Sequence, residues 1–143
     1  MEMKNKKIVL VGGCFDILHY GHIHFLKSAK QLGDYLIVAL ESDVNIARLK
    51  GKNRPIHNQN QRKETLEALS FVDQVIVLPE IMKDEDYLQL VIDTKPNIIA
   101  TTAGDPIINK KRSHAQSVKA NVVEIPKIEV SSSSQIAKLL EIE

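Results

Sequence analysis

The chain has 143 residues, 43% of them hydrophobic and 26% charged, as expected for one globular domain spanning residues 1–143. A net charge of +1 gives no basic field for nucleic acid, and a single cysteine excludes an internal disulfide. Because no apolar run approaches the roughly 20 residues that span a bilayer, we expect a cytoplasmic protein with neither nucleic acid nor membrane as a partner.

The first third of the chain predicts a strand, a helix and a second strand. Residues 7–11 are apolar, rich in β-branched side chains and followed by two glycines, which predicts a buried strand. Apolar residues recur at helical spacing over residues 22–32, and Gly33 is expected to end that helix. Residues 35–40 form a second apolar run. A unit this short implies parallel pairing and a right-handed crossover.

The alternation of strands and helices continues to the end of the chain. We expect a short helix with a loop in 41–55, helices over 59–69, 84–94 and 132–140, and strands over 73–78, 97–100 and 121–125. Ser132 and Gln135 fit a capping box for the last helix. The pattern predicts a three-layer α/β domain with a five-stranded parallel sheet, whose ligands bind at the carboxyl ends of the strands.

The segment after the first strand is the most informative one. It reads Gly-Gly-Cys-Phe-Asp-Ile-Leu-His-Tyr-Gly-His over residues 12–22. The two glycines allow a tight turn, and the helix that follows offers unpaired N–H groups and a positive dipole end to a phosphate. His19 and His22, on either side of Gly21, can donate hydrogen bonds to phosphate oxygens and stabilise charge that develops during transfer.

Other phosphate or metal motifs are absent or incomplete. No Gly-x-x-x-x-Gly-Lys-Ser/Thr motif is present, and no Gly-x-Gly-x-x-Gly follows the strand. His19 and His22 have metal-ligand spacing, but zinc would lack a third protein ligand, so no metal site is predicted. Capping or packing is the structural alternative for the two histidines.

The segment His19-Tyr20-Gly21-His22, preceded by Phe15-Asp16, resembles the His-x-Gly-His signature of the cytidylyltransferase-like nucleotidyltransferases. The resemblance implies a Rossmann-like nucleotidyltransferase domain. It also implies that the two histidines contact a nucleoside triphosphate and stabilise the transition state at its α-phosphorus. The nucleotide-binding residues of this segment would be Gly13, Cys14, Phe15, Asp16 and Gly21. Two roles remain open for Asp16: a metal-bridging water, or hydrogen bonds that hold the turn.

Four further segments resemble the family in the same order. Lys50, in Arg-Leu-Lys-Gly, would be a catalytic residue that neutralises phosphate oxygens, and Arg62 would face the site from a helix. Gly104 and Asp105 would lie near the base and ribose. Lys127 stands where the family has an arginine. A lysine contacts phosphate as a point charge, whereas an arginine can bind it with two parallel hydrogen bonds. Three serines would bind the β- and γ-phosphates: Ser132, Ser133 and Ser134.

Within the family, the chain looks most similar to the adenylyltransferase domain that makes ADP-activated heptose for lipopolysaccharide core biosynthesis. That likeness implies transfer of AMP from ATP to D-glycero-D-manno-heptose 1-phosphate, with release of pyrophosphate. FAD synthetases that adenylylate FMN and glycerol-3-phosphate cytidylyltransferase are also similar, so the acceptor stays open, and CTP remains an alternative to ATP.

The resemblance also implies Mg²⁺, held mainly by the nucleotide phosphates and water, and a homodimer. Lys110, Lys111 and Arg112 form either a solvated run or a hold on the acceptor phosphate. A nucleotide-binding module without turnover is the alternative from another class, and the intact His-x-Gly-His argues against it.

Overall fold

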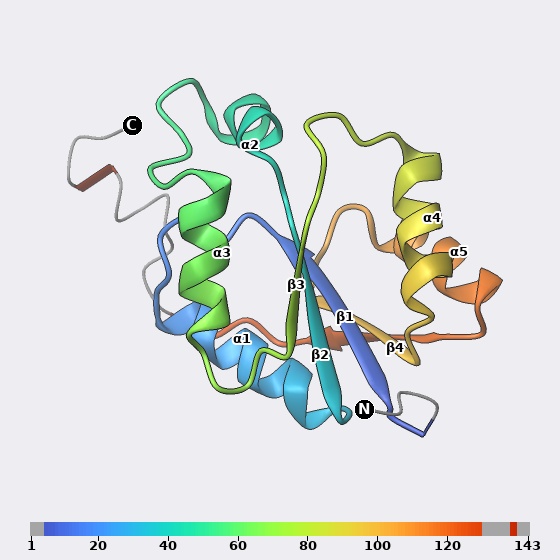
Figure 1. Cartoon of the computed structure of the whole chain (residues 1–143). Helices are drawn as coiled ribbons and strands as arrows, with labels where there is room; N and C mark the ends of the chain where they lie inside the picture. Colours follow the sequence, from blue (N-terminus) through green and yellow to red (C-terminus); the bar gives the residue numbers. More distant parts are fainter. Residues whose placement is uncertain (1–4, 130–137, 140–143) are drawn as a thin grey trace.

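The computed structural model describes residues 5–129 and 138–139, and it forms a three-layer α/β domain (Figure 1). Within these residues, strands and helices alternate. The strands are β1 (Ile8–Gly13), β2 (Tyr35–Leu40), β3 (Gln74–Val77), β4 (Ile98–Thr102) and β5 (Asn121–Ile125). The helices are α1 (Tyr20–Gln31), α2 (Asp43–Lys50), α3 (Gln59–Glu67), α4 (Asp84–Thr94) and α5 (Ile108–Ser117).

All strand pairs are parallel, in the order β3-β2-β1-β4-β5. β1 pairs with β2 along its whole length, from Ile8 to Gly13. It pairs with β4 only at Val9 and Leu10. The strand order reverses between β1 and β4, and sheets of this kind bind ligands at such a reversal, beyond the carboxyl ends of the strands.

The helices cover both faces of the sheet, as Figure 1 shows. Successive residues of β1 point to opposite faces. Val9 therefore joins a buried cluster with Leu26 of α1 and Leu66 of α3. Leu10 joins the other cluster with Val91 of α4 and Ala115 of α5. The predicted fold class, with its five-stranded parallel sheet, is confirmed.

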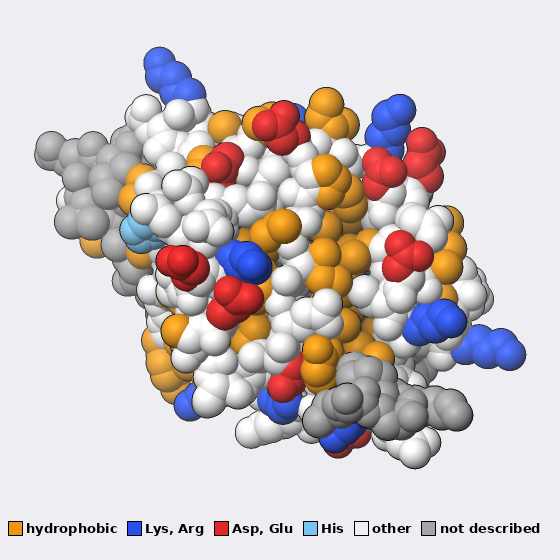
Figure 2. Space-filling model, viewed as in Figure 1, with side chains coloured by type: hydrophobic (Ala, Val, Ile, Leu, Met, Phe, Trp, Pro, Cys, Tyr) orange, Lys and Arg blue, Asp and Glu red, His pale blue; other side chains and the backbone are white. Residues whose placement is uncertain are grey.

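The edge strand β3 leaves apolar side chains at the surface. Figure 2 shows hydrophobic side chains along the sheet edge between α3 and α4. Val77, at the end of β3, is 46% exposed, because no further strand covers it among the described residues. No helix in the described part of the chain is long and apolar enough to cross a membrane.

One helix and the role of one glycine differ from the sequence-based expectation. Helix α5 was not predicted, because residues 108–117 carry few apolar side chains. Gly33 follows α1 as expected, but it does not have the left-handed backbone of a glycine cap. Instead, a Cβ at Gly33 would lie 2.6 Å from the carbonyl oxygen of Lys7, so close packing of the chain against β1 explains the glycine. Most of the predicted helix over 132–140 lies outside the described residues. Within that range the structure describes Lys138 and Leu139, and both are helical.

Candidate active site

The turn that leaves β1 is shaped by an aromatic side chain. Phe15 has a left-handed backbone with φ of 45°, and its buried ring lies against Gly13, where a Cβ would come within 2.7 Å of it. The same ring meets His22 edge to face, with ring centroids 5.2 Å apart. Gly13 therefore allows Phe15 to pack under the turn, and Phe15 supports His22.

His19 begins helix α1 with its own side chain. The imidazole Nδ1 accepts a hydrogen bond of 3.0 Å from the backbone N–H of Gly21. Because Nδ1 is an acceptor, the neutral ring carries its proton on Nε2. The carbonyl oxygen of His19 accepts from the N–H groups of His22 and Ile23. The start of α1 thus has fewer unpaired N–H groups than we expected, and the donors for a phosphate are mainly side chains.

His22 is a largely buried imidazole close to His19. The two ring centroids lie 4.0 Å apart. Burial, followed by the charges of His19 and Lys50, lowers the pKa of His22 to about 4. Burial and Lys50 also lower the pKa of His19. Among the described residues, the buried Nδ1 of His22 has no hydrogen-bond partner, and a buried polar atom left unpaired costs stability.

These groups surround a cavity of about 430 Å³ at the carboxyl end of β1. Lys50, the last residue of α2, reaches it from one side and Lys127, just after β5, from another. Lys50 has no hydrogen bond or ion pair with any part of the chain that the structure describes. The cavity is lined by the predicted residues Gly13, Cys14, Phe15, His19, Gly21, His22, Lys50 and Lys127. No Asp or Glu is among the lining residues that the structure describes, so the charged groups seen there suit an anion.

Asp16 lies behind the turn and is 3% exposed. Its carboxylate accepts hydrogen bonds from Arg54 Nε at 2.8 Å and from the N–H groups of Ile56 and His57 at 2.7 and 2.9 Å. Burial alone would raise the pKa of Asp16, but these bonds lower it overall. Of the two roles left open for Asp16, the geometry matches the structural one, since the carboxylate ties residues 54–57 to the turn.

Arg62 also lies behind the turn, with its guanidinium buried. Nη1 donates to the carbonyl oxygens of Cys14 and Glu41 at 2.8 and 2.9 Å. Nε donates to the carbonyl oxygen of His57, and Nη2 to the Asp43 carboxylate at 2.7 Å. Arg62 does not line the cavity. Arg62 holds the turn in place from behind, and its predicted position facing the site and its nucleotide-binding role stay predictions.

Gly104 and Asp105 form a turn before α5. Gly104 has φ of 83°, and Asp105 accepts from Thr101, Lys111 and the N–H of Ile107. These contacts lower the pKa of Asp105, although burial acts in the opposite direction. Neither residue lines the 430 Å³ cavity, whereas Thr101 and Thr102 at the end of β4 do.

A second cavity, of about 610 Å³, lies on the other face of the sheet. It shares Gly12, Gly13 and Cys14 with the first, so the two meet at the turn after β1. Apolar side chains of the strands line part of it, including Leu10 and Ile99. Polar side chains also line it: Glu41, Asn45, Arg48, Asp84, Tyr87, Lys110, Lys111 and His114. Two cavities that meet at one turn suit two substrates that react with each other at that turn.

No group of three or more metal-ligating side chains occurs within the described residues. The carboxylate of Asp16, in the segment after β1, already has three donors from the protein. The first cavity offers imidazole and ammonium groups instead of carboxylates. This donor set fits a magnesium ion that arrives with a nucleotide and is held by phosphate oxygens and water.

Comparison with known proteins identifies the family. The cytidylyltransferase-like family model matches residues 10–138. The chain belongs to the cytidylyltransferase-like family. Membership confirms the resemblance predicted from the sequence, and with it the class of enzyme, a nucleotidyltransferase. The matched residues include both cavities.

Curated relatives of this cytidylyltransferase-like chain are longer proteins. The bifunctional protein HldE of Campylobacter jejuni is 47% identical over 104 residues, which are 72% of this chain and 22% of the relative. HldE of Helicobacter pylori is 43% identical over 111 residues, 78% of this chain and 23% of the relative. The chain thus spans about a fifth of the curated relatives it matches.

Two solved structures share the fold. A lipopolysaccharide core biosynthesis protein from Thermoplasma volcanium matches with a TM-score of 0.69 and 30% identity, covering 89% of this chain and all of that chain. A pantoate-beta-alanine ligase from Francisella tularensis has the same TM-score at 19% identity, covering 96% of this chain and 67% of that one. The second likeness shows the fold alone.

The structure gathers most of the predicted site residues of this family member, but not all. Eight line the first cavity, while Asp16, Arg62, Gly104 and Asp105 do not. Ser132, Ser133 and Ser134 lie outside the described residues. Sequence reasoning did not select Thr101 or Thr102, although two polar residues at the end of an apolar strand could have indicated them. Of the polar side chains of the second cavity it named Lys110 and Lys111 as a possible hold on the acceptor phosphate, but it missed Glu41, Asn45, Tyr87 and His114.

Proposed function

We propose that this domain transfers the AMP of ATP to a sugar phosphate such as D-glycero-D-manno-heptose 1-phosphate and releases pyrophosphate. The observation that carries the proposal is the first cavity. There the side chains of His19, His22 and Lys50 line one cavity at the end of β1. The identity to HldE proteins supports this acceptor, because the heptose 1-phosphate adenylyltransferase domain is the likeness seen in the sequence.

The triphosphate would occupy the first cavity and the acceptor the second. An oxygen of the acceptor phosphate attacks the α-phosphorus, and the bond between the α-phosphorus and the bridging oxygen breaks. Pyrophosphate leaves with that electron pair. The acceptor phosphate is already ionised, so no side chain has to remove a proton.

Catalysis in this scheme is positioning and charge stabilisation. His19 Nε2–H and the imidazole of His22 donate to phosphate oxygens, while Lys50 and Lys127 neutralise the charge on the leaving pyrophosphate. Ser132, Ser133 and Ser134 would bind the β- and γ-phosphates. A magnesium ion bound with the nucleotide supplies further charge neutralisation. Gly104 and Asp105, beyond β4, would lie on the side of the base.

An FMN adenylyltransferase is the second candidate, and the apolar part of the second cavity favours it. Leu10, Leu78 and Ile99 line that cavity and could pack against a flavin ring. A screen of pyrophosphate release separates the candidates. It crosses the four nucleoside triphosphates with heptose 1-phosphate, FMN and glycerol 3-phosphate, with Mg²⁺ present. We expect the highest rate with ATP and heptose 1-phosphate. The absence of release from every pair would contradict turnover and leave a nucleotide-binding module.

Cytoplasmic location and a homodimer stay predictions. Light scattering of the purified chain would determine its oligomeric state.

A further inference from the structure

Four polar side chains form a connected chain of hydrogen bonds along the second cavity. Arg48 Nε donates to Asn45 Oδ1 at 3.1 Å, and Asn45 Nδ2 donates to Glu41 Oε1 at 2.9 Å. The hydroxyl of Tyr87 donates to the same carboxylate, at 2.9 Å from Oε2 and 3.1 Å from Oε1. All four residues line the 610 Å³ cavity. We call this group the Glu41 network: Glu41, Asn45, Arg48 and Tyr87.

The Glu41 network lies beside the point where transfer would occur. Glu41 follows β2 directly, and its N–H donates to the carbonyl oxygen of Gly13 at 3.0 Å. Its own carbonyl oxygen accepts from Arg62, which also holds Cys14. The backbone of Glu41 is thus fixed to the turn that the two cavities share.

The carboxylate of Glu41 keeps capacity to accept more hydrogen bonds. A carboxylate has about four lone-pair sites, and the described residues supply two N–H or O–H donors, Asn45 and Tyr87. Burial, followed by the charge of Glu41, raises the pKa of Tyr87. Tyr87 therefore stays a donor, which leaves the remaining lone pairs of the carboxylate for hydroxyl groups of a ligand.

Charge along the network differs from one end to the other. Glu41 presents a negative charge next to the turn, and a second phosphate or a carboxylate placed there would be repelled. Arg48, at the other end, is exposed and has further N–H groups beyond those bound to Asn45. Leu10 and Ile99, which line the same cavity, add apolar surface. A pyranose ring offers matching surfaces, since it has hydroxyls at its edge and C–H groups on its face.

We infer that Glu41, held by Tyr87 and Asn45, determines acceptor specificity by accepting hydrogen bonds from hydroxyl groups of a sugar monophosphate. The inference rests on the proposed function and assigns recognition of the acceptor's hydroxyl groups to the Glu41 carboxylate. Tyr87 and Asn45 act through Glu41 and are positioning residues.

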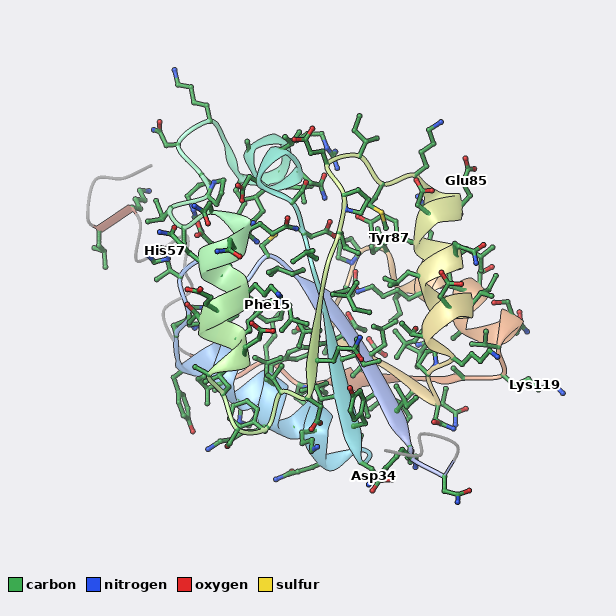
Figure 3. All side chains as sticks on the ribbon, in the orientation of Figure 1. Phe15, Asp34, His57, Glu85, Tyr87 and Lys119 are labelled. Atoms are coloured by element: carbon green, nitrogen blue, oxygen red, sulfur yellow. The ribbon has the colours of Figure 1, made fainter. Side chains whose placement is uncertain are left out.

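Steady-state kinetics of variants test this assignment, with ATP and heptose 1-phosphate as substrates. We expect Glu41→Gln to raise the KM for the sugar phosphate at least tenfold and to leave the KM for ATP and kcat within about threefold. Tyr87→Phe keeps the ring in place and loses only the hydroxyl, so a rise of about threefold is expected. Glu85→Ala is the matched control. Figure 3 shows Glu85 projecting outward from α4, whereas Tyr87 in the same helix points toward the sheet.

Monodeoxy analogues of the sugar phosphate make the test specific. Wild type should discriminate against at least one analogue by tenfold or more in kcat/KM, and Glu41→Gln should lose that discrimination. Unchanged acceptor KM in Glu41→Gln, or a parallel rise for ATP, overturns the inference while the proposed function stands. If wild type releases no pyrophosphate with any phosphorylated acceptor, the proposed function and the inference fail together.

Discussion

The two sides of the turn after β1 use polar side chains in opposite ways. On the core side, Asp16 and Arg62 are bonded to protein groups from several segments. On the cavity side, His22 Nδ1 and the Lys50 ammonium have no partner within the described residues. Leaving the buried His22 Nδ1 unpaired costs stability, whereas the half-exposed Lys50 ammonium is hydrated. The difference teaches that the polar residues around one turn separate into those that bind other parts of the protein and those whose side chains line the cavity.

The largest expected effect is on the core side. Arg62→Ala leaves the carbonyl oxygens of Cys14 and Glu41 without their donor and should lower the free energy of unfolding by about 3–5 kcal/mol, measured by urea denaturation. Lys63→Ala, one residue on, is the control. Its pairing with Glu67 is partly exposed and 3.8 Å long, so its effect should stay within about 0.5 kcal/mol. If the Arg62→Ala protein were stable but bound nucleotide more weakly, Arg62 would have to be assigned to ligand binding and not to the support of the turn.

On the cavity side, His22→Ala should act on turnover. Removing a donor that stabilises transition-state charge costs about 100- to 1,000-fold in kcat. The expected change in pyrophosphate release therefore exceeds any change in folding, which thermal unfolding monitors. A variant that releases pyrophosphate at a near-normal rate would contradict the assignment of His22 as catalytic.

The burial of His22 also predicts a pH dependence of stability. In an unfolded chain histidine titrates near pH 6.5, whereas the pKa of folded His22 is about 4. Between these values the unfolded state binds a proton that the folded state does not, so stability falls as the pH drops from 6.5 toward 4. By pH 5 the loss from this group is about 1–2 kcal/mol after solvent screening.

Chemical denaturation at pH 7 and pH 5 measures that loss. His22→Gln lacks the titrating group, so its stability should fall less between the two pH values than that of wild type. Equal losses in both proteins would show that His22 is not held neutral by its surroundings.

The smallest predicted effect concerns Lys50. Lys50→Ala should lower kcat/KM for ATP about tenfold, because one charged contact to the phosphates is lost. Lys52 lies two residues on, is exposed and does not line the cavity. Lys52→Ala should therefore be close to wild type in the same assay. Equal losses in the two variants would indicate a general effect of surface charge.

The sequence predicted the strands well because a buried parallel sheet is built from short apolar runs. β2 and β5 have the predicted ends, and β3 differs by one residue at each end. Helix α5 was not predicted because few of its residues are buried. The buried ones are His114 and Ala115. Apolar periodicity cannot find a helix that contacts the core so sparingly.

The first cavity was predictable for a local reason and the second was not. His19 and His22 lie three residues apart at the start of one helix, so sequence spacing alone places them together. The Glu41 network joins residues from the end of β2, from α2 and from α4. No spacing in the sequence relates Tyr87 to Glu41, and only the packing of α4 on the sheet brings them into contact.

The early end of pairing between β1 and β4 has a consequence for how this domain can change. After Leu10 the pairing of the two strands ends, and small residues line the second cavity at this point, among them Gly12, Gly13 and Ala100. Substitution of larger lining side chains such as Leu78 or Met82 would therefore change the shape of the second cavity while the separation of the strands stays the same. One fold can in this way accommodate different second substrates beside an unchanged first cavity.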